Sequence, residues 1–487
     1  ARLAIDKALQ AHGGRERIEA LESVSLEYTG LRTMINQSRR ALGPWDREPS
    51  SGRVVFDRKG TRLYAENHNH YPGIGRFSAA WALKGNEGYH WDLHGNSHGR
   101  EWMMKYSGAD AEEPWAFVPR WMPPFLLLAA AQAHTQLRHA GVVRRNGRAH
   151  DAVVFTQRNR QTLTLLIDRA TARLAAFESV RGDGVHGDVL DTVAFDGYRR
   201  HAGVMFPGVR TDFLNGALAR RLDLAYQVNA PLPDTLFELP RDVRAPATPA
   251  HGPPHGAHHG APAGGRLKRI GEGVYLDTDM GGVMIVEFRD FLVVVECPGD
   301  HAMSQSTIDA ARARFPDKPI RYVVPSHTHG DHGGGARAYF HLGATLLTTP
   351  ANVPFYRRLA KVRHTISPDP WSASKRAPRI ETFESYRRIT DGTQTLDLHD
   401  LGPNAHSDTL VFAWLPAQRI LWQADLVFSP AIGPEVNAAM PITVAFARRL
   451  VSLGITDLAS IVESHHDRVI SVEEFRASLR MAGHDYP

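Results

Sequence analysis

The chain has 487 residues, of which 43% are hydrophobic and 22% charged, and its formal net charge is +5. At about 150 residues per domain this length predicts two or three domains, and the near-average composition excludes wholesale disorder, collagen and a coiled coil. A single cysteine, Cys297, excludes a disulfide framework and any multi-cysteine zinc site. The charge divides into +7 over residues 1–266 and −2 over residues 267–487. Because nucleic-acid enzymes gather basic charge around their sites, no nucleic-acid partner is expected.

Residues 1–244 predict a mostly antiparallel β domain with few helices. Helical periodicity over residues 3–21 is broken at Gly13-Gly14, and apolar alternation typical of strands follows. The expected strands include residues 25–28, 53–56, 153–155, 163–167 and 222–226. Six tryptophans of this half could line a groove for an apolar ligand, although aromatic side chains more often pack in a core: Trp45, Trp81, Trp91, Trp102, Trp115 and Trp121.

Residues 245–265 contain only Ala, Gly, Pro, His and Thr. Such a segment cannot bury enough apolar surface to offset its ordering entropy, so it predicts a linker and a domain boundary. The apolar run at residues 125–133 is shorter than the about 20 residues that cross a bilayer. No transmembrane segment is therefore expected.

Residues 266–487 alternate strand and helix patterns, which predicts one layered α/β domain. Residues 283–288 and 291–295 flank Arg289-Asp290 and indicate a hairpin. A helix is expected to begin at Ser304, an apolar strand to cover residues 320–324, and a final helix to begin at the capping box of Ser471 and Glu474.

A cluster of metal-binding residue types follows the strand expected at 320–324. Its sequence is Ser326-His-Thr-His-Gly-Asp-His-Gly-Gly-Gly335. His327 and His329 should project to one side, and Asp331 and His332 toward a neighbouring point. The loop can therefore supply ligands to two metal ions about 3.5–4 Å apart. One loop cannot complete two coordination shells.

Three residues downstream can supply the remaining ligands. His406, Asp425 and His465 each stand next to a strand-like segment. A carboxylate such as Asp425 at the end of an apolar strand is costly to bury unless it is paired or bound to a metal. Nitrogen and oxygen ligands without a thiolate suit zinc, with iron or manganese as alternatives.

This order of motifs resembles the metallo-β-lactamase superfamily, in the dinuclear branch that includes glyoxalase II and lactonases. The resemblance covers about residues 267–487 and implies a four-layer αββα fold. It implies that His327, His329 and His406 hold one metal ion, that Asp331, His332 and His465 hold a second, and that Asp425 bridges the two. It also implies that Asp331 touches the bridging water and is catalytic.

The sequence departs from the family pattern at two places. The last ligand usually stands in a His-Gly pair, whereas His465 is followed by His466, so either residue could ligate, and His465 is favoured. The hairpin commonly ends in an aspartate-glycine turn, and this chain has Glu296-Cys297-Pro298-Gly299. Cys297 is expected to be a buried small side chain and not a nucleophile, because nothing cationic flanks it.

The expected activity is that of a dinuclear zinc hydrolase that uses a bridging hydroxide on an ester, a lactone or a similar acyl substrate. A β-lactamase, a phosphodiesterase and a sulfatase are alternatives within the same fold. Another is an iron-dependent persulfide-type oxygenase, in which His327, His406 and Asp425 alone bind one iron ion. A binding protein with a vestigial site is a third class.

Residues 352–380 form an insertion that such a fold would carry as a loop over the metal face. Tyr356, His364 and Trp371 are its candidate substrate contacts, and ordinary loop packing is the alternative.

The N-terminal half weakly resembles the lipoprotein-carrier-like half-barrels of the bacterial envelope, over about residues 20–240. The resemblance implies a small apolar or amphipathic substrate, or a packing role against the catalytic half. The matching segments are Ile167-Asp168, Gly187-Asp188, Tyr198, Phe206-Pro207 and 229–237. The chain begins at Ala1 without a signal segment, as a processed protein would, so a periplasmic or secreted location is expected. The sequence does not determine whether the protein forms a homo-oligomer.

Overall fold

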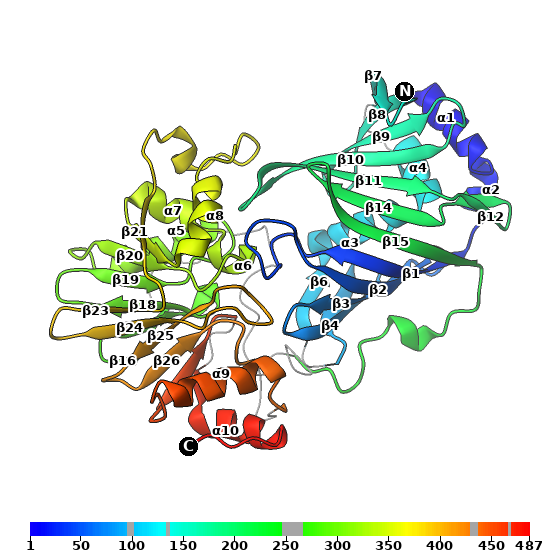
Figure 1. Ribbon diagram of the computed structural model, residues 1–487. Helices are drawn as coiled ribbons and strands as arrows, with labels where there is room; N and C mark the ends of the chain where they lie inside the picture. Colours follow the sequence, from blue (N-terminus) through cyan, green and yellow to red (C-terminus); the bar gives the residue numbers. More distant parts are fainter. Residues whose placement is uncertain (95–101, 133–136, 246–265, 429–436, 466–468) are drawn as a thin grey trace.

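The computed structural model describes residues 1–94, 102–132, 137–245, 266–428, 437–465 and 469–487. It is rich in β structure, with helices in both halves (Figure 1). The expected linker at 245–265 lies outside the described residues except for Ala245, and so does His466.

The described N-terminal half is built on one sheet of thirteen antiparallel strands (Figure 1). The strand patterns expected from the sequence all lie within it. In spatial order the strands are β6 (Trp102–Ser107), β5 (Glu87–Asp92), β4 (Gly75–Lys84), β3 (Arg62–Tyr71), β2 (Arg47–Asp57), β1 (Ser23–Thr33), β15 (Ala217–Val228), β14 (Val209–Leu214), β11 (Gly187–Asp196), β10 (Leu174–Asp183), β9 (Thr162–Asp168), β8 (Arg148–Thr156) and β7 (Arg138–Arg145).

Helices cover one face of this sheet. The first helical segment divides into α1 (Arg2–Ala11) and α2 (Arg15–Glu19) at the two glycines, as expected. The apolar run at 125–133 lies mostly in α4 (Pro123–Gln132), whose side chains are almost all buried against the sheet. This half also contains α3 (Glu112–Phe117) and the two-stranded sheet of β12 (Arg199–His201) and β13 (Val204–Phe206).

The described C-terminal half contains two sheets. The first has the order β16 (Leu267–Gly271), β17 (Val274–Asp277), β18 (Val283–Glu287), β19 (Leu292–Val295), β20 (Ile320–Val324), β21 (Thr345–Thr348) and β22 (Arg379–Thr382). The second has the order β23 (Tyr386–Thr390), β24 (Thr395–Asp400), β25 (Val411–Leu415), β26 (Ile420–Gln423), β27 (Ser460–Glu463) and β28 (Val469–Ser471). The pairing of β18 with β19 confirms the expected hairpin.

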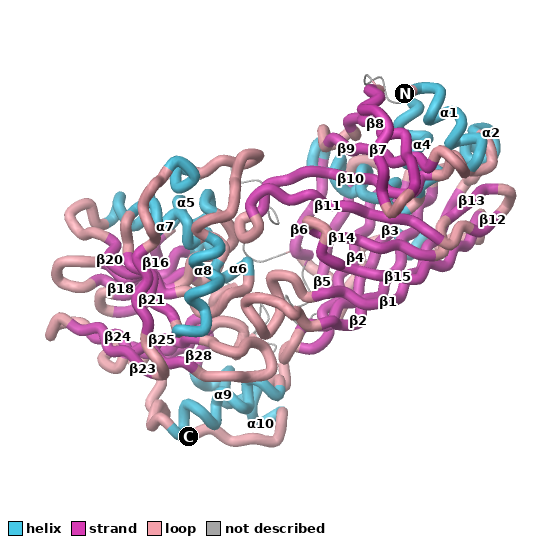
Figure 2. Tube along the Cα trace, turned by 45° about the horizontal axis from the view of Figure 1, so that its top comes forward, coloured by secondary structure: helices cyan, strands magenta, loops and turns pink. Residues whose placement is uncertain are grey.

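Three buried apolar clusters hold this half together. One contains side chains of both sheets, such as Val286 of β18 and Trp422 of β26. A second joins the first sheet to α5 (His301–Arg314), α7 (Ala336–Leu342) and α8 (Val353–Leu359), and a third joins the second sheet to α9 (Pro441–Ser452) and α10 (Val472–Met481). Figure 2 shows α9 and α10 on the side of the second sheet away from α8.

Helix α5 begins earlier than the sequence pattern predicts. Asp300 is its N-cap and accepts a hydrogen bond from the Met303 backbone N–H, whereas Ser304 lies inside the helix and is fully buried. An aspartate at the cap satisfies an otherwise free helix N–H, so it starts the helix ahead of the serine. The capping box of Ser471 and Glu474 is present and starts α10, as predicted.

Candidate metal centre

The metal-binding loop leaves β20 at its carboxyl end. His327 and His329 lie in the bend after Pro325, and Asp331 and His332 lie in the single turn of α6 (Gly330–Gly333). A Cβ atom at Gly334 would approach the Gly299 carbonyl oxygen to 2.1 Å. Only glycine allows the loop to pack this closely against the turn after β19.

The other three candidate ligands come from the second sheet. His406 lies between β24 and β25, Asp425 follows β26, and His465 follows β27. Asp425 has a φ of 57°, a left-handed conformation that is costly for a non-glycine residue and common at functional sites. The seven predicted side chains are thus brought together in two groups: His327, His329, His406 and Asp425 in one, and Asp331, His332 and His465 in the other.

Asp425 stands between the two groups. Its Oδ2 atom lies 3.0 Å from Nε2 of His406 and 2.9 Å from Nε2 of His332, while its Oδ1 atom lies 2.7 Å from Nε2 of His465. The carboxylate is buried. One carboxylate that reaches both groups is the arrangement that a pair of ions would share.

The imidazole nitrogens that face this centre have lone pairs and lack suitable partners. His329 Nδ1 is buried without a hydrogen bond, and His332 Nε2 has only the Asp425 carboxylate beside it, at 2.9 Å. The Nε2 atoms of His327 and His406 lie 3.2 Å apart, although the Nδ1 atom of His406 already donates its proton to the Pro72 carbonyl. Buried polar atoms in this state are costly, and a cation between them removes the cost. The donor set therefore fits metal ions.

Burial favours the neutral form of two of these rings, whereas the carboxylates of Asp425, Asp331 and Glu296 raise the pKa of His332 well above its usual value. Burial lowers the pKa of His327 to about 3 and the pKa of His329 well below its usual value. The His465 side chain is 34% exposed, and although desolvation lowers its pKa, the Asp425 carboxylate outweighs this and raises the pKa to about 9. Neutral imidazole is the form that binds a metal ion.

Glu296 is a buried residue beside the candidate metal centre that the sequence motifs did not assign to it. It lies at the end of β19 with a φ of 91°, and it accepts hydrogen bonds from Nδ1 of His332 (2.9 Å) and from the hydroxyl of Ser326 (2.8 Å). The Ser326 oxygen in turn accepts from Nδ1 of His327 at 2.9 Å. One carboxylate therefore orients two candidate ligands, and its place directly after the expected hairpin is its sequence signal.

The aromatic side chains proposed as substrate contacts are buried, and the Tyr356 hydroxyl donates to the backbone carbonyl of His327 in the metal-binding loop. Tyr356 and Trp371 are buried in the apolar cluster around α7 and α8, where the Trp371 N–H donates to the Ala360 carbonyl. His364 is buried between residues whose backbone groups bond to Asp188 of the N-terminal half. Cys297 is fully buried, and burial raises the pKa of its thiol, which agrees with the expectation that it is not a nucleophile.

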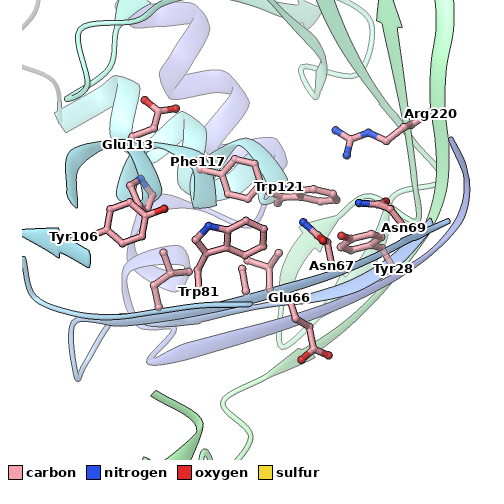
Figure 3. A pocket seen from close by; sticks show the side chains of 14 residues that line it. Tyr28, Glu66, Asn67, Asn69, Trp81, Tyr106, Glu113, Phe117, Trp121 and Arg220 are labelled. Carbon is pink, nitrogen blue, oxygen red and sulfur yellow. The ribbon is translucent and has the colours of Figure 1, made fainter. Parts of the chain in front are cut away.

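The N-terminal half contains a cavity of about 210 Å³ (Figure 3). Trp81, Trp121, Phe117 and Tyr28 form much of its wall, and Asn67, Asn69 and Arg220 add polar groups. Among the six tryptophans that could line a groove, Trp81 and Trp121 line this cavity. Trp121 also belongs to the buried core cluster that contains Trp115, and Trp91 lies in another buried cluster.

No protein-family profile and no curated protein matches the sequence. Among solved structures, the FIM-1 metallo-β-lactamase of Pseudomonas aeruginosa in its mono-zinc form is 22% identical, covers 46% of this chain and 97% of its own, and gives a TM-score of 0.33. A stereoselective inverting sec-alkylsulfatase from a Pseudomonas species is 18% identical, with coverages of 44% and 40% and a TM-score of 0.31.

A LolA-superfamily protein from Nitrosomonas europaea is also similar, at 15% identity, with coverages of 49% and 97% and a TM-score of 0.30. These matches agree with the two resemblances predicted from the sequence, one to the metallo-β-lactamase superfamily and one to lipoprotein-carrier-like domains. Among the described residues, none of the helices has the length and apolar character needed to cross a membrane.

Proposed function

We propose that this protein is a dinuclear metal-dependent hydrolase of esters, lactones or similar acyl substrates. The observation that carries the proposal is the position of Asp425, whose two oxygens reach His406 and His332 on one side and His465 on the other. His327, His329 and His406 would hold the first ion, Asp331, His332 and His465 the second, and Asp425 would contact both.

Two such ions would lower the pKa of a shared water to about 7 and polarise the carbonyl that it attacks. The chain's own contribution is orientation. Asp331 accepts a hydrogen bond from Gln37 through Oδ1, which leaves Oδ2 directed toward His332, 3.7 Å away. That oxygen can ligate and also accept a proton from the attacking water, so Asp331 is the proposed catalytic residue.

The finer assignments belong to the same proposal. Zinc is the expected metal because every donor is an imidazole nitrogen or a carboxylate oxygen. The aromatic cavity of the N-terminal half supports an apolar or amphipathic small-molecule substrate. We assign catalysis to residues 266–487 with an αββα arrangement, a mostly β domain to residues 1–244, and a periplasmic or secreted location to the protein.

Metal content and a substrate panel test the proposal together. The purified protein is analysed for zinc, iron and manganese and then assayed with chromogenic esters, lactones, a cephalosporin, an aryl sulfate and a bis-phosphate. We expect about two zinc ions per chain and turnover of acyl substrates that stops on chelation and returns with zinc.

Three results would overturn this function. One is hydrolysis by the metal-free protein. Another is turnover confined to the sulfate or phosphate ester. The third is one iron ion per chain with oxygen uptake in the presence of a thiol substrate, which would favour the oxygenase alternative.

A further inference from the structure

Two loops of the N-terminal half reach the metal-binding loop of the C-terminal half. The connection between β1 and β2 extends to α6, and the hairpin of β10 and β11 extends toward α8 (Figures 1 and 2). The Gly330 N–H donates to the Asn36 carbonyl at 3.1 Å, and the Asp408 N–H donates to the Arg39 carbonyl at 2.8 Å. Val185 of the second loop is buried in the apolar cluster of α7 and α8.

Three candidate metal ligands bond directly to the N-terminal half. Nε2 of His329 lies 3.0 Å from the Ser38 carbonyl oxygen, and Nδ1 of His406 lies 2.8 Å from the Pro72 carbonyl oxygen. The Gln37 side-chain amide donates to Oδ1 of Asp331 at 2.7 Å. By contrast, His327 and His332 are oriented within the C-terminal half, through Ser326 and Glu296.

These contacts decide which ring nitrogen faces the centre. A carbonyl oxygen can only accept a hydrogen bond, so the nitrogen beside it must carry the proton. His329 is thereby fixed with its lone pair on Nδ1, the atom that is buried without a partner, and His406 is fixed with its lone pair on Nε2. The N-terminal half therefore sets the tautomer of two of the three histidines in the first group.

The loop at 34–46 is held in shape by its own bonds. Asp46 accepts hydrogen bonds from the Ser38 hydroxyl (2.8 Å) and from the Arg39 backbone and guanidinium groups, and the Met34 N–H donates to the Asp46 carbonyl. The Ser38 carbonyl is thus presented from a closed loop, which places it before any metal binds.

Gly73 allows the second acceptor to come close. Its φ is 74°, and a Cβ atom there would lie 2.7 Å from the His406 backbone nitrogen. Any side chain at residue 73 would push the turn away and move the Pro72 carbonyl off the His406 ring.

We propose that the N-terminal half supplies the outer coordination shell of the metal centre, with the Ser38 and Pro72 carbonyls and the Gln37 amide positioning His329, His406 and Asp331. The two halves are then one functional unit, because the C-terminal half alone would lack acceptors for two ligands. The inference rests on the proposed metal centre and does not depend on which substrate is hydrolysed.

Metal affinity measured without substrate tests the inference. The full chain and its Gln37→Ala variant are titrated with zinc against a chromophoric chelator, and with cobalt to follow the ligand-field spectrum. We expect Gln37→Ala to weaken the ion at the Asp331 group by about 10- to 100-fold, as is usual when an outer-shell partner is removed, and to leave the first ion nearly unchanged. Gln227→Ala is the matched control, because Gln227 is an exposed glutamine of the same half.

Gly73→Ala tests the other group. It should weaken the first ion by about 10- to 100-fold and change the cobalt spectrum, while circular dichroism of the metal-free protein stays that of the parent. Parent affinities for both ions in Gln37→Ala and Gly73→Ala would overturn the proposal, as would an equal loss in Gln227→Ala. A protein that shows these affinity changes but hydrolyses no acyl substrate would refute the proposed function and leave this inference standing.

Discussion

Asp425 places its Oδ2 atom 3.0 Å from Nε2 of His406, and both side chains are buried. A carboxylate and an imidazole lone pair this close, away from solvent, require a shared cation or proton. Because the other carboxylate oxygen contacts His465 at 2.7 Å, Asp425 contacts both groups of candidate ligands.

Replacement of Asp425 should therefore affect both ions. In Asp425→Ala the second ion should be lost first, and turnover should fall by about a thousandfold or more, since several kcal/mol of transition-state stabilisation depend on the ion pair. Asp425→Asn keeps the shape but loses the charge, so it should resemble the Ala variant. Metal content and steady-state kinetics measure both effects.

Asp408→Ala is the control for this experiment. Asp408 is exposed two residues beyond His406, so we expect only a small change in activity. If Asp425→Ala retains two ions and near-parent turnover, the assignment of Asp425 as the bridging ligand is wrong, and the metal ligands must be sought among the histidines.

Glu296 gives a second prediction. Its carboxylate accepts three hydrogen bonds, from the Ser326 N–H, the Ser326 hydroxyl and Nδ1 of His332. Glu296→Gln would turn an N–H₂ group toward some of these donors, so His332 should lose its fixed orientation and the second ion should bind about 10- to 100-fold more weakly. Zinc titration against a chelator measures the effect, with Glu287→Gln, in the neighbouring strand, as the control. Equal zinc affinity in Glu296→Gln and the parent would show that Glu296 does not orient the site.

The sequence was informative where function depends on side-chain identity in a short segment. His327 to His332 follow a strand and are followed by three glycines, and the three downstream ligands also stand next to strands, so the local pattern predicts these candidate ligands. The Ser38 and Pro72 carbonyls could not be predicted, because every residue has a carbonyl and only the tertiary packing of the two halves selects these two. A hydrogen bond that a backbone carbonyl accepts cannot be predicted from the type of residue that carries the carbonyl.

The insertion at 352–380 shows a different limit. The sequence does not show whether the aromatic residues of this insertion face solvent or the core. In the structure, Arg337 of α7 holds the segment in place. The buried Arg337 guanidinium donates to the carbonyls of Leu359 and Val362 and forms a salt bridge with Asp369, so the segment is held against the core. A partner so far along the chain cannot be inferred from the insertion itself.

This ion pair predicts a pH-dependent loss of stability. Burial alone would raise the pKa of Asp369, but hydrogen bonds from Arg337 and Ser372 outweigh it and hold the pKa well below its usual value. A lowered carboxyl pKa stabilises the fold above about pH 4 and loses that contribution as the pH falls further. Asp369→Asn should cost about 3–5 kcal/mol at pH 7, because it leaves a buried guanidinium unpaired.

Urea unfolding at pH 7 and at pH 3 measures this difference, which should shrink at the lower pH. The exposed pair of Arg419 and Asp457 is the matched comparison, and Asp457→Asn should cost less than about 1 kcal/mol. If Asp369→Asn is as stable as the parent at pH 7, the Arg337 contact does not hold the insertion.

Removal of metal should destabilise the C-terminal half without unfolding it. The protein buries apolar clusters on both sides of its two sheets, so the fold does not depend on the ions. Bound zinc would relieve the buried Nδ1 atom of His329, which has no hydrogen-bond partner. With free zinc at about a thousand times its dissociation constant, linkage adds about 4 kcal/mol to the free energy of unfolding. At about 2–4 °C per kcal/mol for a domain of this size, the melting temperature should rise by about 10 °C when zinc is bound.

Differential scanning calorimetry with chelator, with zinc and with magnesium as the control measures this change in melting temperature. Magnesium should have little effect, because imidazole-rich sites bind it poorly. Equal melting temperatures in all three conditions would mean that the histidine cluster does not bind zinc in the folded protein.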